Sequence, residues 1–554
     1  MDSNDNDEFL ETEQLKKIGI ATLDDTFNNN KDNKLYKIRD KSYAIAQKLK
    51  NLSKSEIDIA KQNIYKIQKE FALQYPSLFN SSPFLIYCHV DLDSFYASCE
   101  SLDHPEYKSI PLAVGSMNML TTSNYVARKY GVKAGMPGYI GKQLCPTLKI
   151  VKCDFAKYNY YSERVMSVLS IFDEDIEIYG VDEACLVFDD SKYKKAVMKL
   201  NDIGYNISVL NQEASKVRVS PKIVGFDQHY SSTNNSYKIF TPQNDSIYTP
   251  ITDTKFSFRN IRKLVDNIRT LVFISTGLTI SSGISVTRGL SKYACGINKP
   301  NGSFVIDKNF DSHILDLETD KINGIGLATK ELLLKAYNIK YIKELRDNLH
   351  FIYLTLPYKS FINLFNLSYG LSVFDFSDRS NKPVKSIGMN TSFRPTTDFS
   401  DICTVLWCLC TSLCTKLKSK SLVCSTITLH YKFSSFSSRT KQSKTSKLID
   451  DPVQLFNICY DLLLASKVIL DTKIVPNKIR LLGVSCSLLT SVNKKGMYIF
   501  TSTVYNFKVC PICKKESIHL NNFMFECHVN SCLNSKEKEN AKLKNTLDFY
   551  VKKT

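Results

Sequence analysis

The chain has 554 residues, a hydrophobic content of 43% and a formal net charge of +18, from 73 Lys and Arg against 55 Asp and Glu. This length suits several domains, and the positive excess favours a polyanionic partner, because Lys and Arg displace counterions from phosphates. The chain opens on the acidic and polar sequence MDSND, and no apolar run approaches about 20 residues, so we expect neither a signal peptide nor a membrane span.

Residues 1–83 are polar and show a helical pattern. Apolar side chains recur at helical intervals with lysines on the other faces, at Ala44, Leu49, Leu52, Ile57, Ile59, Ile64 and Ile67. The spacing predicts a helical extension that packs on a domain with a solvated outer face.

A first acidic cluster follows a predicted buried strand. The apolar run FLIYCHV at residues 84–90 leads directly into DLDSFY, which carries Asp91 and Asp93. Apolar, β-branched runs of this length are typical of core strands, so these carboxylates are delivered to a rigid strand end.

A second acidic cluster lies between two shorter apolar runs. Asp182 and Glu183 stand in the sequence GVDEA, after IEIY at residues 176–179 and before CLVF at residues 185–188. Neighbouring residues on a flat strand face opposite ways, so both acids can serve one site only at a bend, with which Gly180 is compatible. Carboxylates gathered in this way suit two Mg²⁺ ions; the alternative is that each cluster caps a turn or faces solvent.

Further motifs give the clusters a context. TSNYVARKYGV occupies residues 122–132 and NKPNG occupies residues 298–302. In this order the motifs resemble the Y-family DNA polymerases, and within them the kappa class, from about residue 84 to residue 487. The resemblance implies an error-prone, template-directed DNA polymerase for translesion synthesis and DNA repair, acting in the nucleus. Two alternatives are a catalytically silent DNA-damage scaffold and a nucleotidyl cyclase-type palm enzyme.

The same resemblance implies an α/β (α+β) right-hand fold of several domains. An N-terminal extension like the N-clasp would occupy residues 1–83. The catalytic palm would occupy residues 84–118 and 153–315, with the Asn-, Ser- and Tyr-rich residues 191–255 as a disordered insertion. The other expected domains are the fingers at 119–152, the thumb at 316–384, the little finger at 385–490 and a tail with a zinc finger at 491–554.

The resemblance also assigns roles at the catalytic site. Asp91 and Asp182 would bridge two Mg²⁺ ions, Glu183 would hold the ion nearest the primer 3′ hydroxyl, and the Leu92 carbonyl would complete the ligands. The family usually has Ser-Leu before this Asp-Glu pair where this chain has Gly180 and Val181, but both acids are present.

Contacts to the incoming deoxynucleoside triphosphate are implied in the same way. The triphosphate would be held by Tyr125, Arg128, Lys299 and the backbone amides of Phe95 and Tyr96. Tyr96 stands at the steric gate that excludes a ribose hydroxyl, with Tyr158 behind it. Asp93 is expected to be structural.

Two later stretches suit contacts with primer-template DNA. Gly324 and Gly326 lie between helix-like segments, as in a helix-hairpin-helix or in an ordinary helix turn. Residues 426–433 and 478–484 alternate as half-buried strands. Between them, residues 434–447 carry four basic side chains and could lie on phosphates or form a solvated loop.

The tail contains a metal-ligand spacing. Cys510 and Cys513 form C-x₂-C, and His528 and Cys532 form H-x₃-C, which suits one tetrahedral Zn²⁺, with Cys527 as an alternative to His528. The form resembles ubiquitin-binding zinc fingers, but Asn530 replaces the usual Asp, so we expect zinc rather than ubiquitin.

The last residues resemble a degenerate clamp-binding PIP box. The sequence KNTLDFYV runs from Lys544 to Val551 and lacks the usual Gln. Binding to a sliding clamp (PCNA) through this segment is therefore an expectation from a weak motif.

Overall fold

The computed structural model describes residues 34–79, 84–204, 206–216, 251–307, 309–372, 375, 384–468, 475, 477–491, 507–509 and 516–518. The chain divides into two compact units, Met1–Ser380 and Asn381–Thr554. Each unit is described by itself.

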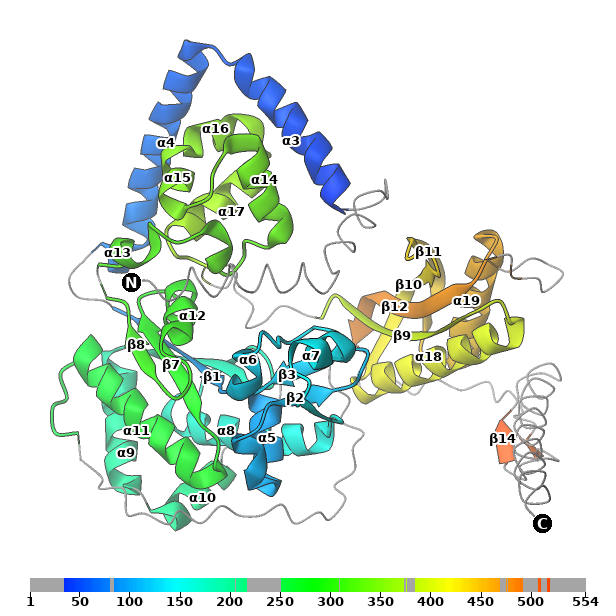
Figure 1. The fold of residues 1–554 in the computed structure, drawn as a ribbon, viewed down its shortest axis with the longest axis horizontal. Coiled ribbons are helices and arrows are strands. Elements are labelled where there is room, and N and C mark those ends of the chain that lie inside the picture. The colour runs from blue at the N-terminus through cyan, green and yellow to red at the C-terminus, as the bar shows by residue number, and fades with distance from the viewer. Residues whose placement is uncertain are drawn as a thin grey trace. The chain divides into compact units, whose positions relative to one another are not determined.

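A five-stranded sheet forms the centre of the first unit (Figure 1). Its order is β5-β6-β1-β7-β8, and its strands are β5 (Glu177–Ile178), β6 (Glu183–Phe188), β1 (Ile86–Leu92), β7 (Ile280–Ser285) and β8 (Ser303–Val305). The central strand β1 is antiparallel to both β6 and β7. The strands expected around residues 84–90, 176–179 and 185–188 are confirmed.

The two faces of this sheet differ in chemistry. One face of β1 is apolar and belongs to a core shared with α5 (Phe95–Asp103), α8 (Phe155–Phe172) and α11 (Phe258–Thr276). The opposite face carries Tyr87, His89 and Asp91, because alternate strand residues point to opposite sides. Helix α12 (Arg288–Ile297) packs on β1 and β7. It approaches closely at Gly283, where an added Cβ would lie 2.0 Å from the Ser291 carbonyl oxygen.

The expected disordered insertion is wrong over its first part. Residues 190–216 form α9 (Asp190–Ile203) and α10 (Ile207–Lys216). Tyr193, Val197 and Leu200 are buried at helical spacing in the main core, and this apolar stripe among lysines was the missed signal. Residues 217–250 lie outside the described residues.

A second, three-stranded sheet has the order β3-β2-β4, with β2 (Leu112–Gly115), β3 (Leu120–Ser123) and β4 (Lys149–Val151). Between β3 and β4 the chain forms helices α6 (Tyr125–Arg128) and α7 (Gly138–Leu144). The boundary expected at residue 119 is wrong, because β2 is the central strand of this sheet. Ala113 belongs to its small core, whereas Leu112 and Val114 belong to the main core.

Helices dominate the end of the first unit. They are α13 (Asp311–Ile314), α14 (Leu327–Tyr337), α15 (Ile342–Asp347), α16 (Leu349–Thr355) and α17 (Tyr358–Ser368). The helical pattern expected near the N-terminus is confirmed by α3 (Lys34–Lys50) and α4 (Lys54–Gln74), which lie along α14 and α16 (Figure 1). Ile45, Ile64 and Phe71 share the core of these helices. The segment before Gly324 is the single 3₁₀ turn η3 (Thr319–Lys321), so the first helix of the expected pair is short.

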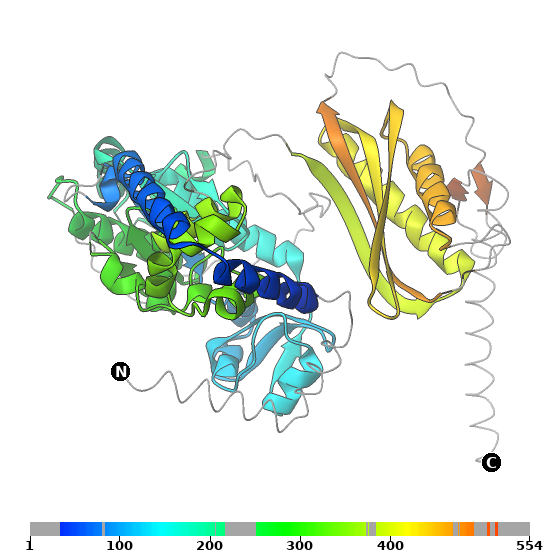
Figure 2. The same ribbon diagram turned by 90° about the horizontal axis from the view of Figure 1, so that it is seen from above.

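The second unit is an antiparallel sheet with the order β11-β10-β12-β9. Its strands are β9 (Ser386–Thr396), β10 (Leu422–Phe433), β11 (Ser438–Ile449) and β12 (Ile479–Ser491), and Figure 2 shows α18 (Phe399–Ser419) and α19 (Pro452–Ala465) on one face. The strands expected at 426–433 and 478–484 are confirmed. The solvated-loop alternative for residues 434–447 is wrong, since most of this segment is the edge strand β11.

One helix in the described part of the chain, α18, is long and apolar enough to cross a membrane by length and composition alone, although Asp401, Lys416 and Lys418 interrupt it. Its apolar stripe is buried in the core of the second unit, at Ile402, Leu406, Leu409, Leu413 and Leu417.

Candidate active site

The acidic clusters meet on the polar face of the central sheet, which α12 partly covers. Asp91, near the end of β1, is directly opposite Glu183, the first residue of β6. Asp182 precedes it in the β5–β6 hairpin, and its carbonyl accepts a hydrogen bond of 2.9 Å from the Leu92 amide. The Tyr179 amide closes the bend by donating to the Glu183 carbonyl at 3.0 Å. The hairpin that the adjacent acids require is therefore present.

Two lysines contact these carboxylates. Lys299, which follows α12, forms an ion pair with Asp91. Lys292, on α12 itself, donates to Glu183 at 2.6 Å. Sequence reasoning named Lys299 as a triphosphate ligand and missed Lys292, which lies only seven residues before it.

The carboxyl groups are only partly stabilised by these lysines. Burial raises the pKa of Asp91 to about 6, although Lys299 opposes the shift. Burial and the neighbouring Glu183 also raise the pKa of Asp182. Burial acts in the same direction on Glu183, but the hydrogen bond and charge of Lys292 prevail and lower its pKa. Two of the three acids therefore carry charge that the protein does not fully balance, which is the condition that a divalent cation relieves.

His89 is a further residue of this cluster. It lies two positions before Asp91 and so on the same face of β1, and one ring nitrogen is 4.0 Å from the Glu183 carboxylate. His89, Asp91 and Glu183 can each offer a ligand atom within 4.8 Å of the others. Burial lowers the pKa of His89 to about 3, so its ring is neutral at physiological pH. The alternation along the strand could have identified it.

Asp93 is held from several sides, as expected of a structural residue. Its carboxylate accepts hydrogen bonds from the Ser281 hydroxyl at 2.7 Å, the Thr279 hydroxyl at 2.9 Å and the Asn301 amide at 2.8 Å. The next residue, Ser94, adopts a left-handed conformation with φ of 44°. Asp93 thereby fixes the sharp turn between β1 and α5.

Tyr96 lies in the first turn of α5 and is stacked on another ring. Its centroid is 4.1 Å from that of Tyr158, with 12° between the planes. The Tyr158 hydroxyl donates to Glu100 at 2.7 Å, and Lys157 contacts the same carboxylate at 2.9 Å. The expectation that Tyr158 supports Tyr96 is confirmed by this stack.

The two remaining predicted phosphate contacts lie on α6. The Tyr125 hydroxyl reaches Asp93 at 3.4 Å, which brings it beside the acidic cluster. The Arg128 guanidinium lies 4.7 Å from the Tyr125 ring centroid, and its Nε donates to the Ser123 carbonyl at 3.1 Å. Tyr125 is thus joined to the cluster directly, and Arg128 only through Tyr125.

The structure does not describe the residues of the tail motifs. Cys510, Cys513, His528 and Cys532 lie outside the described residues, as do the alternative ligand Cys527 and the segment from Lys544 to Val551.

The chain is similar to known proteins over most of its length. Residues 90–296 match the model of the impB/mucB/samB family, and residues 384–497 match that of the family's C-terminal domain. The human protein named DNA polymerase kappa is 30% identical over 523 residues, covering 88% of this chain and 57% of the relative. The chain therefore spans little more than half the length of that relative.

Shorter relatives and a solved structure agree with these matches. A DNA polymerase IV of Ureaplasma parvum is 29% identical over 425 residues, covering 75% of this chain and 98% of the relative. The solved structure of a chimeric Y-family DNA polymerase aligns with a TM-score of 0.52 at 21% identity, covering 74% of this chain and all of that one, and so supports the fold. The family matches and the polymerase relatives together show that the chain belongs to the impB/mucB/samB family, the Y-family DNA polymerases, and within it is kappa-like.

Proposed function

We propose that this protein is a template-directed DNA polymerase that adds deoxynucleotides to a primer 3′ end during translesion synthesis and DNA repair. The observation that carries the proposal is the opposed pair Asp91 and Glu183, with Lys292 and Lys299 beside them, on the face of a sheet in a Y-family chain. Neither a scaffold nor a cyclase is favoured by an observation of this kind.

Y-family polymerases use divalent metal ions, and we propose two Mg²⁺ ions here. Asp91, Asp182, Glu183 and the Leu92 carbonyl would hold them. When bound, the ions would supply Lewis-acid stabilisation of a hydroxyl nucleophile and of a leaving pyrophosphate. The raised pKa of both aspartates supports the fit, because their charge lacks full compensation from the protein.

The nucleotide site would be formed around this cluster. Lys299 and Arg128 are cations that suit phosphate oxygens, and the Phe95 and Tyr96 amides lie at the N-terminal end of α5. Tyr96 would exclude a ribose 2′ hydroxyl, since its stack on Tyr158 leaves the ring little freedom to move aside.

Domain roles are part of the same proposal. The five-stranded sheet would be the palm, the small sheet at residues 112–151 the fingers, helices α13–α17 the thumb and residues 384–491 the little finger. Gly324 and Gly326 would approach a DNA phosphate. Helices α3 and α4 would extend the grip on primer-template DNA as an N-clasp.

The tail would add recruitment functions. We propose one Zn²⁺ held by Cys510, Cys513, His528 and Cys532, with ubiquitin binding weak or absent because Asn530 lacks the usual charge. We also propose that the segment from Lys544 to Val551 binds a sliding clamp and that the protein acts in the nucleus.

Primer extension with purified protein tests the function. Asp182→Ala is expected to abolish Mg²⁺-dependent extension while binding of primer-template DNA stays within about twofold. Asp202→Ala, which removes an exposed carboxylate on α9, is the matched control and should extend like the wild type. Substantial extension by Asp182→Ala would overturn the site, and failure of the wild type to copy past any of a panel of damaged bases would overturn the translesion role.

A further inference from the structure

Helix α12 contacts both strands of the hairpin that carries the catalytic acids. Arg288 binds Glu177 on β5, and Lys292 binds Glu183 on β6. Arg288 and Lys292 are four residues apart, so they lie on the same face of the helix. One helix therefore holds the hairpin on either side of the bend at which Asp182 is placed.

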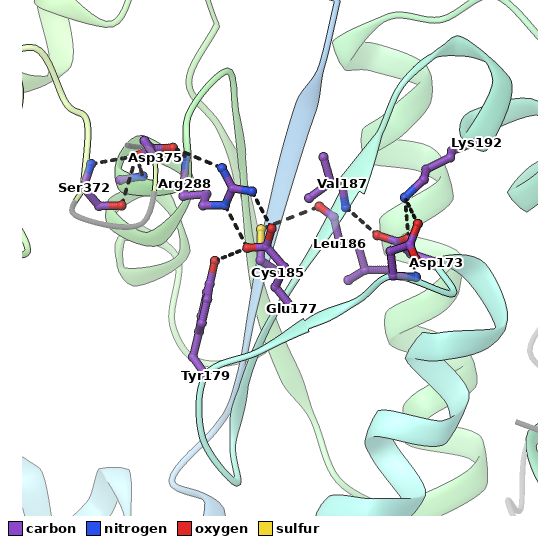
Figure 3. A network of polar contacts seen from close by, with 12 residues as sticks. Asp173, Glu177, Tyr179, Cys185, Leu186, Val187, Lys192, Arg288, Ser372 and Asp375 are labelled. Atoms are coloured by element: carbon purple, nitrogen blue, oxygen red, sulfur yellow. Dashed lines mark hydrogen bonds and ion pairs between the residues drawn. The ribbon is translucent and has the colours of Figure 1, made fainter. Parts of the chain in front are cut away.

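The contact between Arg288 and Glu177 has a defined geometry (Figure 3). Nε of Arg288 donates to one Glu177 oxygen at 2.7 Å, and a second guanidinium nitrogen contacts the other oxygen, which makes the pair bidentate. The Tyr179 hydroxyl donates to the same carboxylate at 2.7 Å. The guanidinium also lies 4.7 Å from the Tyr87 ring centroid. Bidentate arginine pairs fix orientation as well as charge.

The hairpin needs such a contact because β5 is a weak element. It has two residues, lies at the edge of the sheet and pairs with β6 only at Glu177 with Cys185 and at Ile178 with Ala184. An edge strand with so few ladder pairs opens locally at small cost. Any such opening releases one side of the bend that carries Asp182, because the Tyr179 amide donates to the Glu183 carbonyl there.

Asp375 fixes the opposite side of Arg288. Its carboxylate accepts from the Arg288 amide at 2.8 Å and the Gly289 amide at 3.2 Å, and so satisfies the first N–H groups of α12. It also accepts from the Ser372 amide at 2.6 Å and the Ser372 hydroxyl at 2.9 Å. At Gly289, an added Cβ would lie 2.4 Å from the Gly370 carbonyl, which shows how closely this segment follows the helix.

We propose that Arg288 is a positioning residue for the polymerase reaction. It holds Glu177, and with it the hairpin, so that Asp182 and Glu183 share one metal site with Asp91, while Asp375 keeps α12 and its arginine in place. The inference rests on the proposed polymerase function. It predicts that metal binding and the chemical step depend on Arg288, whereas DNA binding does not.

Two variants test this role by different routes. Arg288→Ala removes the guanidinium, and Glu177→Gln keeps the size of the side chain and one acceptor oxygen. Single-turnover insertion is measured over a series of Mg²⁺ concentrations. We expect each variant to lower the maximal rate about tenfold and to raise the half-saturating Mg²⁺ concentration, with the primer-template Kd within about twofold of the wild type. Because both changes act on the same ion pair, the double variant should lose much less than the product of the two single effects.

Arg346→Ala is the matched control. Arg346 on α15 is buried to a similar degree, with 13% of its side chain exposed against 20% for Arg288, and it forms an ion pair of 2.7 Å with Asp311. Its Nε donates to the Ser368 carbonyl, and both of these partners lie outside the hairpin. This variant should lose melting temperature without a change in maximal rate or in Mg²⁺ dependence. If Arg288→Ala and Glu177→Gln behave like it, the positioning role is wrong.

A binding readout separates this inference from the proposed function. The Mg²⁺-dependent rise in melting temperature requires no catalysis, because a ligand that binds the folded state stabilises it. We expect a smaller rise at the same Mg²⁺ concentration for Arg288→Ala than for Arg346→Ala, and recovery of part of it in Arg288→Lys. An equal rise in the two alanine variants contradicts the positioning role. A wild type that shows the rise but extends no primer contradicts the polymerase proposal instead.

Discussion

Two regions of this protein carry their charges in opposite ways. Where β1 and β6 pair in the middle of the first sheet, Asp91 and Glu183 lie opposite each other, are half-buried, and each has a lysine partner, Lys299 and Lys292. On β11, at the edge of the other sheet, Arg439, Lys441, Lys444 and Lys447 are all exposed. A buried charge interacts mainly with the groups next to it. Water and salt screen each exposed charge, so exposed charges act on a charged partner mainly through their total.

The comparison predicts its largest effect at Asp91. Asp91→Asn keeps the shape of the side chain but removes charge from the metal cluster, so we expect the maximal insertion rate to fall about a thousandfold. DNA affinity should stay within about twofold. Single-turnover extension and a binding titration measure both quantities. A loss below about tenfold would show that β1 carries no catalytic acid at this position.

A second test concerns Tyr96, whose ring stacks on Tyr158 just after β1. Tyr96→Ala removes the ring that is fixed on Tyr158, so discrimination against ribonucleotides should fall about a hundredfold. The ratio of kcat/KM for deoxy- and ribonucleotides measures it. Tyr158→Phe keeps the stack and should leave the ratio unchanged. If Tyr96→Ala also leaves it unchanged, another residue forms the gate.

A third test concerns α12, the helix that carries Lys292, the partner of Glu183. Gly283→Ala places a Cβ against the backbone of α12, so the free energy of unfolding should fall by about 2 kcal/mol. Gly296→Ala has open space around it and should raise helix stability by up to about 1 kcal/mol. Denaturant unfolding compares them. Equal stabilities would show that α12 can move away from β7 at no cost.

The smallest effect is expected on β11. Replacing Lys441, Lys444 and Lys447 together by Gln should weaken DNA binding uniformly across sequences. It should also reduce the slope of log Kd against log salt by up to about 1 for each of these lysines that neutralises a phosphate. Lys195→Gln, at an exposed site on α9, should leave the slope unchanged. An unchanged slope in the triple variant would remove β11 from the DNA surface.

The sequence predicted the central strands well because their pattern is local. The run before Asp91 and the two runs around Asp182 are apolar, short and bounded by turns, and each became a strand of the main sheet. A bend was predicted from the need of two adjacent acids to face one site, and the β5–β6 hairpin lies at that position. The local pattern was sufficient for this part of the geometry.

Other features depended on contacts that no local pattern contains. Lys292 lies 109 residues from Glu183, and Asp375 lies 87 residues from Arg288. Helices α9 and α10 were not predicted, because the composition of this segment is polar. Their packing depends on a few apolar side chains, such as Tyr193 and Leu200, in the main core. The basic segment after Phe433 was not identified as a strand, because β11 gains its structure from pairing with β10 rather than from an apolar face.

Single-nucleotide insertion tests the central claim most directly. The wild type and Glu183→Gln are each assayed opposite every templating base, with and without Mg²⁺. The account predicts that the wild type inserts the complementary nucleotide preferentially and only with the divalent ion. Glu183→Gln should bind the same DNA and insert at a rate at least about a hundredfold lower. Insertion that ignores the template or the metal ion, or that persists in Glu183→Gln, would contradict it.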